Sequence, residues 1–229
     1  MTKPAPFTII LVESALECIA FLSRRKGKRI QKKGNKPLEK TLLDASIHHH
    51  LMKELPDREK RGRPDIIHNA LLMALGARLN QDGFLQVYVH TRNDEIIAFN
   101  PEVRIPRNYN RFVGLMEQLI EVKKIPPNSE QTLISMTSQK LYDLLNKINP
   151  NRVILLTENG LPTSTKELQK IFSENERVVC LIGGFPHGDF SQFIYDLADL
   201  KISIYSKSLS TLVVVSSVIQ IAEQSLNIS

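Results

Sequence analysis

The feature that most constrains the fold is the regular alternation of short apolar runs with helical patterns from residue 151 to the C-terminus. Apolar runs at 153–156, 178–182 and 200–205 are each followed by a stretch with helical periodicity. Short apolar runs without polar alternation are typical of strands that are covered on both faces. Strands that alternate with helices predict an α/β fold, with a mostly parallel sheet flanked by helices.

The first 150 residues are less regular, but 229 residues still fit one domain. Two alternating segments, at 84–90 and 95–99, predict a β-hairpin with a four-residue loop, which we expect to be an insertion at about 84–105. Other strands are expected at 7–12 and 40–43. Helices are expected at 14–22, 46–55, 64–76, 108–123, 130–148, 165–172, 190–197 and 209–226.

A glycine-rich loop follows the apolar run at 178–182. Gly183 and Gly184 allow the backbone to turn tightly and to approach a ligand, and Gly188 closes the loop. A second loop, rich in serine, follows the run at 200–205, and two such loops at strand ends predict a small-molecule crevice. Asp189 stands where a phosphate loop has lysine, so a ligand with a cationic centre fits better than a polyphosphate. The alternative is a loop that only turns the chain.

The formal net charge of +6 is concentrated in one segment. Residues 24–40 hold nine lysines and arginines and one acidic residue, whereas the rest of the chain has 21 basic and 23 acidic residues. Like charges repel and extend such an arm, and a nucleic-acid backbone is its natural partner. The alternatives are a solvated loop or, less favoured because the arm has no apolar face, a membrane surface.

A second basic group consists of Arg104, Arg107 and Arg111, at spacing i, i+3 and i+7. If a helix begins near Pro106, these arginines lie on one face. No acidic residue lies between positions 102 and 117 to pair with them, which favours RNA contact over ion pairing within the protein. The neighbouring Tyr109 could then stack on a base.

Other kinds of site find little support in the sequence. Cys18 and Cys180 lie in apolar runs and are expected to be buried thiols, typical of a reducing compartment. His48, His49 and His50 are consecutive, so their side chains diverge on a helix, and we expect no metal site. The GxGxxG pattern of nicotinamide enzymes is absent. No apolar stretch approaches the roughly 20 residues of a membrane span, and no signal peptide is expected.

Several short motifs together carry a resemblance to a known family. They are RPDIIH at 63–68, LQVYV at 85–89, VRIPR at 103–107, RF at 111–112 and GGFPHG at 183–188. In this order, the motifs resemble the Nep1/Emg1 family of SPOUT-class ribosome-biogenesis methyltransferases. The resemblance covers nearly the whole chain, from about residue 7.

This resemblance implies both a fold and a reaction. The fold is a single SPOUT domain over 1–229, with a C-terminal trefoil knot in the cofactor-binding half, about 151–229. Knots are exceptional in proteins. The reaction is the methylation of N1 of a pseudouridine in small-subunit ribosomal RNA, with S-adenosylmethionine as cofactor. Expected partners are an rRNA hairpin, a second copy of the chain and ribosomal proteins of the small subunit. The short N-terminus favours a cytoplasmic, archaeal form; a eukaryotic relative would be nucleolar.

The resemblance also implies site residues. Asp65 and Arg63 are the expected catalytic pair, with Asp65 either accepting the N1 proton or, as we favour, only orienting Arg63. The expected RNA contacts are Arg63, Arg104, Arg107 and Arg111. The expected cofactor contacts are Leu156, Thr157, Gly183, Gly188, Asp189, Phe190, Ile204, Tyr205, Ser206, Lys207, Ser208 and Leu209. The chain departs from the family at residues 205–211, where it reads YSKSLST.

Two other functions remain open from the sequence. The chain could be an rRNA-binding assembly factor whose main role is structural. It could also be a SPOUT enzyme that methylates the ribose 2′-hydroxyl, in which case uridine and pseudouridine RNAs would be equal substrates.

Overall fold

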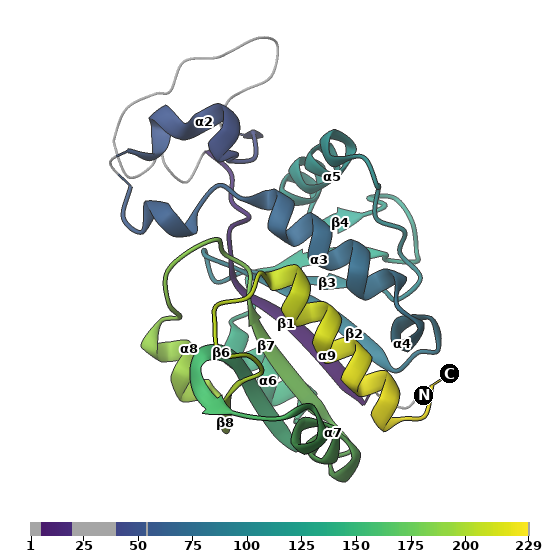
Figure 1. The fold of residues 1–229 in the computed structure, drawn as a ribbon. Coiled ribbons are helices and arrows are strands. Elements are labelled where there is room, and N and C mark those ends of the chain that lie inside the picture. The colour runs from purple at the N-terminus through teal and green to yellow at the C-terminus, as the bar shows by residue number, and fades with distance from the viewer. Residues whose placement is uncertain (1–5, 20–39, 54, 229) are drawn as a thin grey trace.

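A computed structural model describes residues 6–19, 40–53 and 55–228 (Figure 1). Its centre is one eight-stranded sheet in the order β4-β5-β3-β2-β1-β7-β6-β8. The basic arm at 24–40 lies outside the described residues except for Lys40. The strands are β1 (Phe7–Ser14), β2 (Leu85–Thr91), β3 (Ile96–Phe99), β4 (Lys124–Ile125), β5 (Ile134–Thr137), β6 (Arg152–Pro162), β7 (Val178–Gly183) and β8 (Leu200–Ser203).

The sheet has a parallel part and an antiparallel edge. β1 pairs in parallel with β2 and β7, and β6 pairs in parallel with β7 and β8. β3, β5 and β4 extend the sheet beyond β2 in antiparallel pairs. The predicted mostly parallel α/β fold is therefore confirmed. The hairpin β2–β3 belongs to the main sheet, because β2 lies beside β1.

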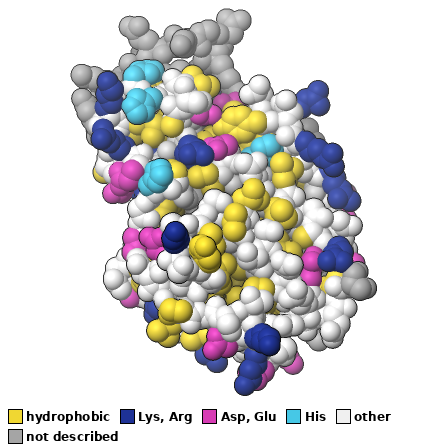
Figure 2. Space-filling model, in the orientation of Figure 1, with side chains coloured by type: hydrophobic (Ala, Val, Ile, Leu, Met, Phe, Trp, Pro, Cys, Tyr) yellow, Lys and Arg dark blue, Asp and Glu magenta, His cyan; other side chains and the backbone are white. Residues whose placement is uncertain are grey.

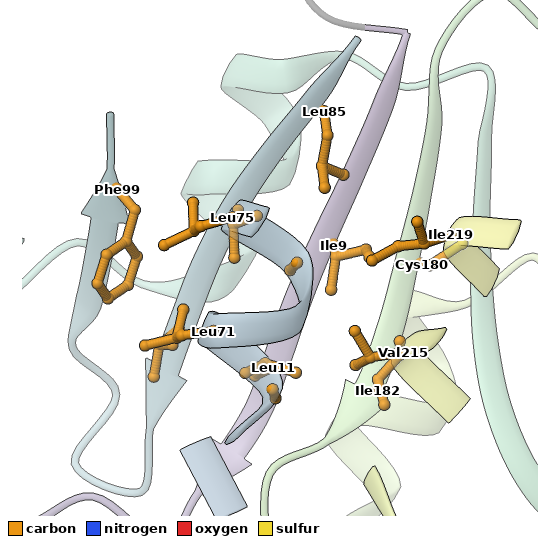
Figure 3. Packing of buried hydrophobic residues seen from close by; sticks show 14 of the residues in the cluster. Ile9, Leu11, Leu71, Leu75, Leu85, Phe99, Cys180, Ile182, Val215 and Ile219 are labelled. Atoms are coloured by element: carbon orange, nitrogen blue, oxygen red, sulfur yellow. The ribbon is translucent and has the colours of Figure 1, made fainter. Parts of the chain in front are cut away.

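Helices cover both faces of the sheet. The larger core packs α3, α5, α7 and α9 against one face, and the smaller core packs α6 and α8 against the other (Figure 1). Figure 3 shows Leu71 and Leu75 of α3 and Val215 of α9 meeting the strands in the larger core. The helices are α2 (Ala45–Met52), α3 (Pro64–Gly76), α4 (Arg78–Gln81), α5 (Tyr109–Val122), α6 (Leu141–Ile148), α7 (Thr165–Glu174), α8 (Gln192–Leu197) and α9 (Thr211–Ser225), with a 3-10 turn, η2, at Arg58–Lys60.

Strand β1 shows why the apolar runs lack polar alternation. Ile9 and Leu11 point into the larger core, while Ile10 and Val12 point into the smaller one. All four side chains are at most 2% exposed. A strand covered on both faces needs apolar side chains at every position.

Two expected elements near the N-terminus are wrong. The expected helix at 14–22 is absent over its described part, 14–19, because the backbone bonds there go elsewhere. The amide of Ala15 donates to the carbonyl of Gly184, and that of Ile19 to Thr41. The expected strand at 40–43 is only one bridge, between Leu42 and Cys18.

The expected helix at 130–148 begins with a strand instead. β5 occupies Ile134–Thr137, and only α6 is helical. Ile134 and Met136 are buried, whereas Ser135 and Thr137 are less so, which is the two-residue period of a strand. Among the described helices, none is long and apolar enough to cross a membrane.

Candidate active site

The carboxyl ends of β6, β7 and β8 open into a cavity of about 610 Å³. These strands are neighbours, so Leu156, Ile182 and Ile202 lie at one edge of the sheet. The strand ends, the loops that follow them and the first turn of α9 form one wall of the cavity. Residues of α3 form the other wall. The crevice is at the place in an α/β sheet where ligands bind.

Eleven of the twelve expected cofactor residues line this cavity, and Ser206 does not. The Ser206 side chain is exposed. The cavity brings the glycine loop and the serine-rich loop together, as the sequence predicted. The eleven residues are Leu156, Thr157, Gly183, Gly188, Asp189, Phe190, Ile204, Tyr205, Lys207, Ser208 and Leu209.

Sequence reasoning missed several lining residues. One is Thr211, at the start of α9, whose hydroxyl donates to the carbonyl of Gly183 at 2.7 Å. The position of Thr211 at a helix start, just after the serine-rich loop, was the available signal. Others are Ile66 and Asn69 of α3, Glu158, Ile182, Phe185, Pro186, His187, Ile202, Ser203, Ser210, Leu212 and Val214.

Backbone contacts shape the wall formed by the strand ends and the loops that follow them. β6 continues beyond Leu156 to Pro162, and its far end pairs again with β8. At Gly160 the two backbones touch, since a Cβ there would lie 2.5 Å from the amide nitrogen of Ile202. Gly184 likewise packs on Ser14, whose hydroxyl a Cβ would overlap. Neither position has room for a side chain.

Asp189 carries a negative charge at the cavity. Its carboxylate accepts hydrogen bonds from the Phe190 amide at 2.7 Å, the Tyr195 hydroxyl at 2.8 Å and the Asn159 side chain at 3.1 Å. The Tyr195 hydroxyl also meets the Thr157 hydroxyl at 3.2 Å. These contacts hold the carboxylate in place at the rim, where a cationic ligand group would be attracted to it.

Arg63 and Asp65 lie together on the α3 wall of the same cavity. The guanidinium donates two hydrogen bonds to the carboxylate, from Nε to Oδ1 and from Nη2 to Oδ2, each of 2.8 Å. The hydrogen bond to Asp65 raises the pKa of Arg63 above its ordinary value, so the guanidinium stays charged. Since both carboxylate oxygens face the arginine, the geometry favours the orienting role of Asp65 over the proton-accepting one.

Arg104, Arg107 and Arg111 lie outside the cavity lining, and their expected helical face does not form. α5 begins at Tyr109, with Asn108 as its N-cap, so Arg104 and Arg107 precede the helix. All three side chains are exposed, and none has an acidic partner within the described part of the chain. They remain available for an anionic partner.

Contacts with His68 of α3 and with Asp44, before α2, hold the segment that carries these arginines. His68 of α3 meets the carbonyl of Pro106 at 2.7 Å through Nε2, and its ring stacks on Phe112 at 4.5 Å. The Tyr109 hydroxyl donates to Asp44, the N-cap of α2, at 2.5 Å. Burial opposes ionisation of Asp44, but hydrogen bonds from Ser46 and Tyr109 outweigh it and lower the pKa of this carboxyl.

The remaining candidates from the sequence are the three consecutive histidines and the two cysteines. His48 is buried, and its Nδ1 accepts a hydrogen bond from the Asp44 amide, while His49 and His50 are exposed. No cluster of three metal-ligating side chains occurs among the residues the structure describes. Cys18 and Cys180 are buried, as predicted, and burial raises the pKa of the Cys180 thiol to about 12.

Comparison with known proteins gives consistent matches over the whole chain. The family model "EMG1/NEP1 methyltransferase" matches residues 9–223. "Ribosomal RNA small subunit methyltransferase Nep1" of Staphylothermus marinus is 48% identical, with 100% of each chain covered. The protein of the same name from Pyrococcus furiosus is 40% identical over 92% of this chain and 93% of its own.

A solved structure matches the fold as well. The crystal structure of Archaeoglobus fulgidus Nep1 bound to S-adenosylhomocysteine aligns with a TM-score of 0.79. The two chains are 37% identical, and the match covers 98% of this chain and 100% of the other.

Proposed function

This chain belongs to the EMG1/NEP1 methyltransferase family, and we propose that it methylates N1 of a pseudouridine in small-subunit ribosomal RNA. The coarser activity, S-adenosylmethionine-dependent methylation of small-subunit rRNA, follows from the relatives and from the bound S-adenosylhomocysteine of the matching structure. The observation that carries the finer proposal is one cavity that joins the glycine and serine-rich loops to the Arg63–Asp65 pair.

The cavity fits the cofactor. Its volume of about 610 Å³ lies in the range of small-molecule sites, roughly 300–1,000 Å³. Leu156, Ile182 and Ile202 provide apolar surface, and Asp189 provides a negative charge at the rim. S-adenosylmethionine supplies an electrophilic methyl group on a sulfonium, so the protein has mainly to align the attacking atom.

Pseudouridine is joined to ribose through carbon, which leaves N1 with a proton that uridine lacks. This proton must leave during or after the attack of N1 on the methyl group. In our proposal Arg63, held by Asp65, contacts the RNA beside the cavity and orients the base, and the N1 proton passes to solvent water after the attack. The alternative is that Asp65 accepts the proton directly or through water.

The exposed arginines extend this binding surface. Arg104, Arg107 and Arg111 contact phosphates or bases of the RNA, and the hairpin loop lets the target base leave its stack at little cost. We also propose that the basic arm at 24–40 contacts nucleic acid and that small-subunit ribosomal proteins are further partners. The relatives named above point to an archaeal protein, for which we propose a cytoplasmic location.

We further propose a homodimer and a trefoil knot formed by about residues 151–229. Met73, Leu212 and Val213 of α3 and α9 are partly exposed apolar side chains, and these two helices pack together. Figure 2 shows hydrophobic side chains gathered in the middle of the face where α3 and α9 lie in Figure 1. Such a patch is typical of an interaction surface. Sedimentation of the chain and of Val213→Glu tests the dimer; an unchanged monomer for both contradicts it.

Methyl transfer from labelled S-adenosylmethionine to two small-subunit rRNA hairpins, with uridine or pseudouridine at the target, tests the proposed chemistry. We expect transfer to the pseudouridine RNA alone. Equal transfer to both RNAs would indicate the ribose 2′-hydroxyl as the acceptor. Tight RNA binding without transfer to either would favour the assembly-factor function.

A further inference from the structure

Lys60 packs against the glycine loop. It ends the 3-10 turn η2 and does not line the cavity, although Phe185, Gly188 and Asp189, which it touches, all do. Its side chain is only 14% exposed. A lysine so largely buried needs partners for its charge.

Three contacts fix Lys60 to the glycine loop. Its ammonium group donates a hydrogen bond to the backbone carbonyl of Asp189. The same group lies 4.8 Å from the centre of the Phe185 ring, a cation–π distance. The aliphatic stem lies against Gly188, where a Cβ would come within 3.0 Å of the Lys60 Cε. Lys60 therefore supports the loop over most of its length.

Glu13, at the end of β1, completes the support. One carboxylate oxygen lies 3.4 Å from the Lys60 ammonium, and the other accepts a hydrogen bond from the amide of Ser191 at 3.2 Å. Glu13 has a φ of +50°, which is unfavourable for a residue with a Cβ. Its backbone amide donates to Nδ1 of buried His90 at 3.3 Å. A largely buried carboxylate on a strained backbone, in contact with both Lys60 and the residue that caps α8, is typical of a functional constraint.

The segment that carries Lys60 also leads to the α3 wall of the cavity, where Arg63 lies. Lys60 is three residues before Arg63, and the intervening Arg61 is anchored by a buried ion pair with Glu17 at 2.5 Å. Pro64 then starts α3 directly. The short, anchored segment from Lys60 to Arg63 thus connects the lysine that contacts the glycine loop with the arginine that lines the α3 wall of the cavity.

We propose that Lys60, braced by Glu13, is a positioning residue that couples cofactor binding to RNA binding. A cofactor that orders the glycine loop fixes Lys60, and Lys60 fixes the segment that presents Arg63. RNA bound to Arg63 in turn orders this segment and, through Lys60, the glycine loop. The coupling is therefore positive and, as thermodynamics requires, equal in both directions. This inference rests on the proposed function.

The test compares two affinities in three proteins. S-adenosylhomocysteine binding is measured by calorimetry, and binding of a fluorescein-labelled small-subunit rRNA transcript by anisotropy, with and without saturating S-adenosylhomocysteine. The proteins are the wild-type chain, Lys60→Met and Lys170→Met. Methionine keeps an aliphatic stem for the contact with Gly188 but removes the charge. Lys170 is a matched control, because it pairs with Glu174 at 3.7 Å on α7 and does not line the cavity.

In the wild-type chain and in Lys170→Met, we expect S-adenosylhomocysteine to tighten RNA binding about fivefold or more. In Lys60→Met the ratio of the two RNA affinities falls to about one, even at saturating S-adenosylhomocysteine. A merely structural lysine would weaken both affinities and leave that ratio unchanged. A preserved ratio in Lys60→Met, or no coupling in a wild-type chain that binds both ligands, overturns the proposal.

Two further variants keep the test decisive if Lys60→Met does not fold. Lys60→Arg retains the charge and is expected to restore most of the coupling. Glu13→Gln keeps an acceptor for the Ser191 amide but loses the charge that faces Lys60, so it is expected to reduce the coupling. A wild-type chain that shows coupling without methyl transfer would contradict the proposed function alone, whereas one that binds neither ligand contradicts both.

Discussion

The two walls of the cavity are built in different ways. The wall that we propose to bind the cofactor is made largely of backbone, from the ends of β6, β7 and β8 and the loops that follow them. The facing wall depends on individual side chains, foremost the guanidinium of Arg63 and the carboxylate of Asp65. The exposed arginines at 104, 107 and 111 continue this side-chain surface outside the cavity.

This difference predicts where each wall tolerates change. A backbone wall depends on the paths of the strands and on the lack of a Cβ at close contacts, so its exposed loop side chains can vary. The departure from the family that we expect at residues 205–211 would then be tolerated, since most of this loop lines the cavity. A side-chain wall depends on residue identity, so single polar substitutions change its function while the fold persists.

Gly160→Ala is the strongest test of the backbone wall. Its Cβ would meet the Ile202 backbone at 2.5 Å, which strand pairing leaves no room to relieve. We expect a loss of about 3 kcal/mol or more in the free energy of unfolding, measured by denaturant titration, and loss of cofactor binding.

Gly114→Ala provides the matched control for this substitution. Gly114 lies within α5 and has open space around its Cβ position. Alanine there should stabilise the protein by roughly 0.5–1 kcal/mol. Equal effects of the two substitutions would contradict a backbone contact at Gly160.

Arg63→Lys tests the side-chain wall at the cavity. Lysine keeps the charge but cannot make two parallel hydrogen bonds to the Asp65 carboxylate. We expect kcat/KM for RNA methylation to fall by about 10- to 100-fold while S-adenosylhomocysteine affinity and stability change little. Wild-type kcat/KM in this variant would show that charge alone suffices.

Arg104→Ala tests the side-chain surface outside the cavity. The arginine is exposed and has no acidic partner in the described part of the chain, so its loss should not disturb the fold. RNA binding should weaken by about 1–3 kcal/mol, measured by anisotropy, with cofactor affinity nearly unchanged. Lys166→Ala, at an exposed position on α7, is the control. Equal loss of both affinities, in a folded Arg104→Ala protein, would contradict the division into two walls.

The smallest expected effect is a pH dependence of stability that arises from His90, whose Nδ1 accepts a hydrogen bond from the Glu13 amide. Burial lowers the pKa of His90 below its ordinary value near 6.5, although Asp94 and Glu13 oppose this shift. The unfolded chain therefore binds more protons in this range, so the His90 contribution to stability is complete above about pH 6.5 and is lost as pH falls toward the lowered pKa. His90→Gln should flatten the fall in melting temperature between neutral and mildly acidic pH. An unchanged profile would exclude His90 as its source.

The sequence predicted the backbone wall better than the side-chain wall. The regular βα pattern after residue 151 located β6, β7 and β8 and, through them, the loops that line the cavity. Such local patterns suffice because parallel strands bring their carboxyl ends to one edge. The extension of β6 to Pro162 was missed, since its contact at Gly160 with β8 is tertiary.

The errors lie where tertiary contacts override local pattern. Residues 15–19 have helical spacing, but backbone amides in this segment bond to distant carbonyl groups. β5 was predicted as part of a helix because the residues on either side of it were read as helical. The predicted helix at 108–123 is confirmed as α5, and only the start near Pro106, on which a common face for the three arginines depended, is wrong. The support formed by Glu13 and Lys60 joins residues 47 positions apart, which no local motif reveals.

The most direct test of the two-wall arrangement is a crystal structure of the chain with S-adenosylhomocysteine and a pseudouridine-containing RNA hairpin. We predict that the cofactor product lies against Leu156, Gly183 and Leu209, with the target base between it and Arg63. Phosphates of the hairpin should lie near Arg104 and Arg107. A base placed away from Arg63, or a cofactor product outside the crevice at β6–β8, would contradict the arrangement.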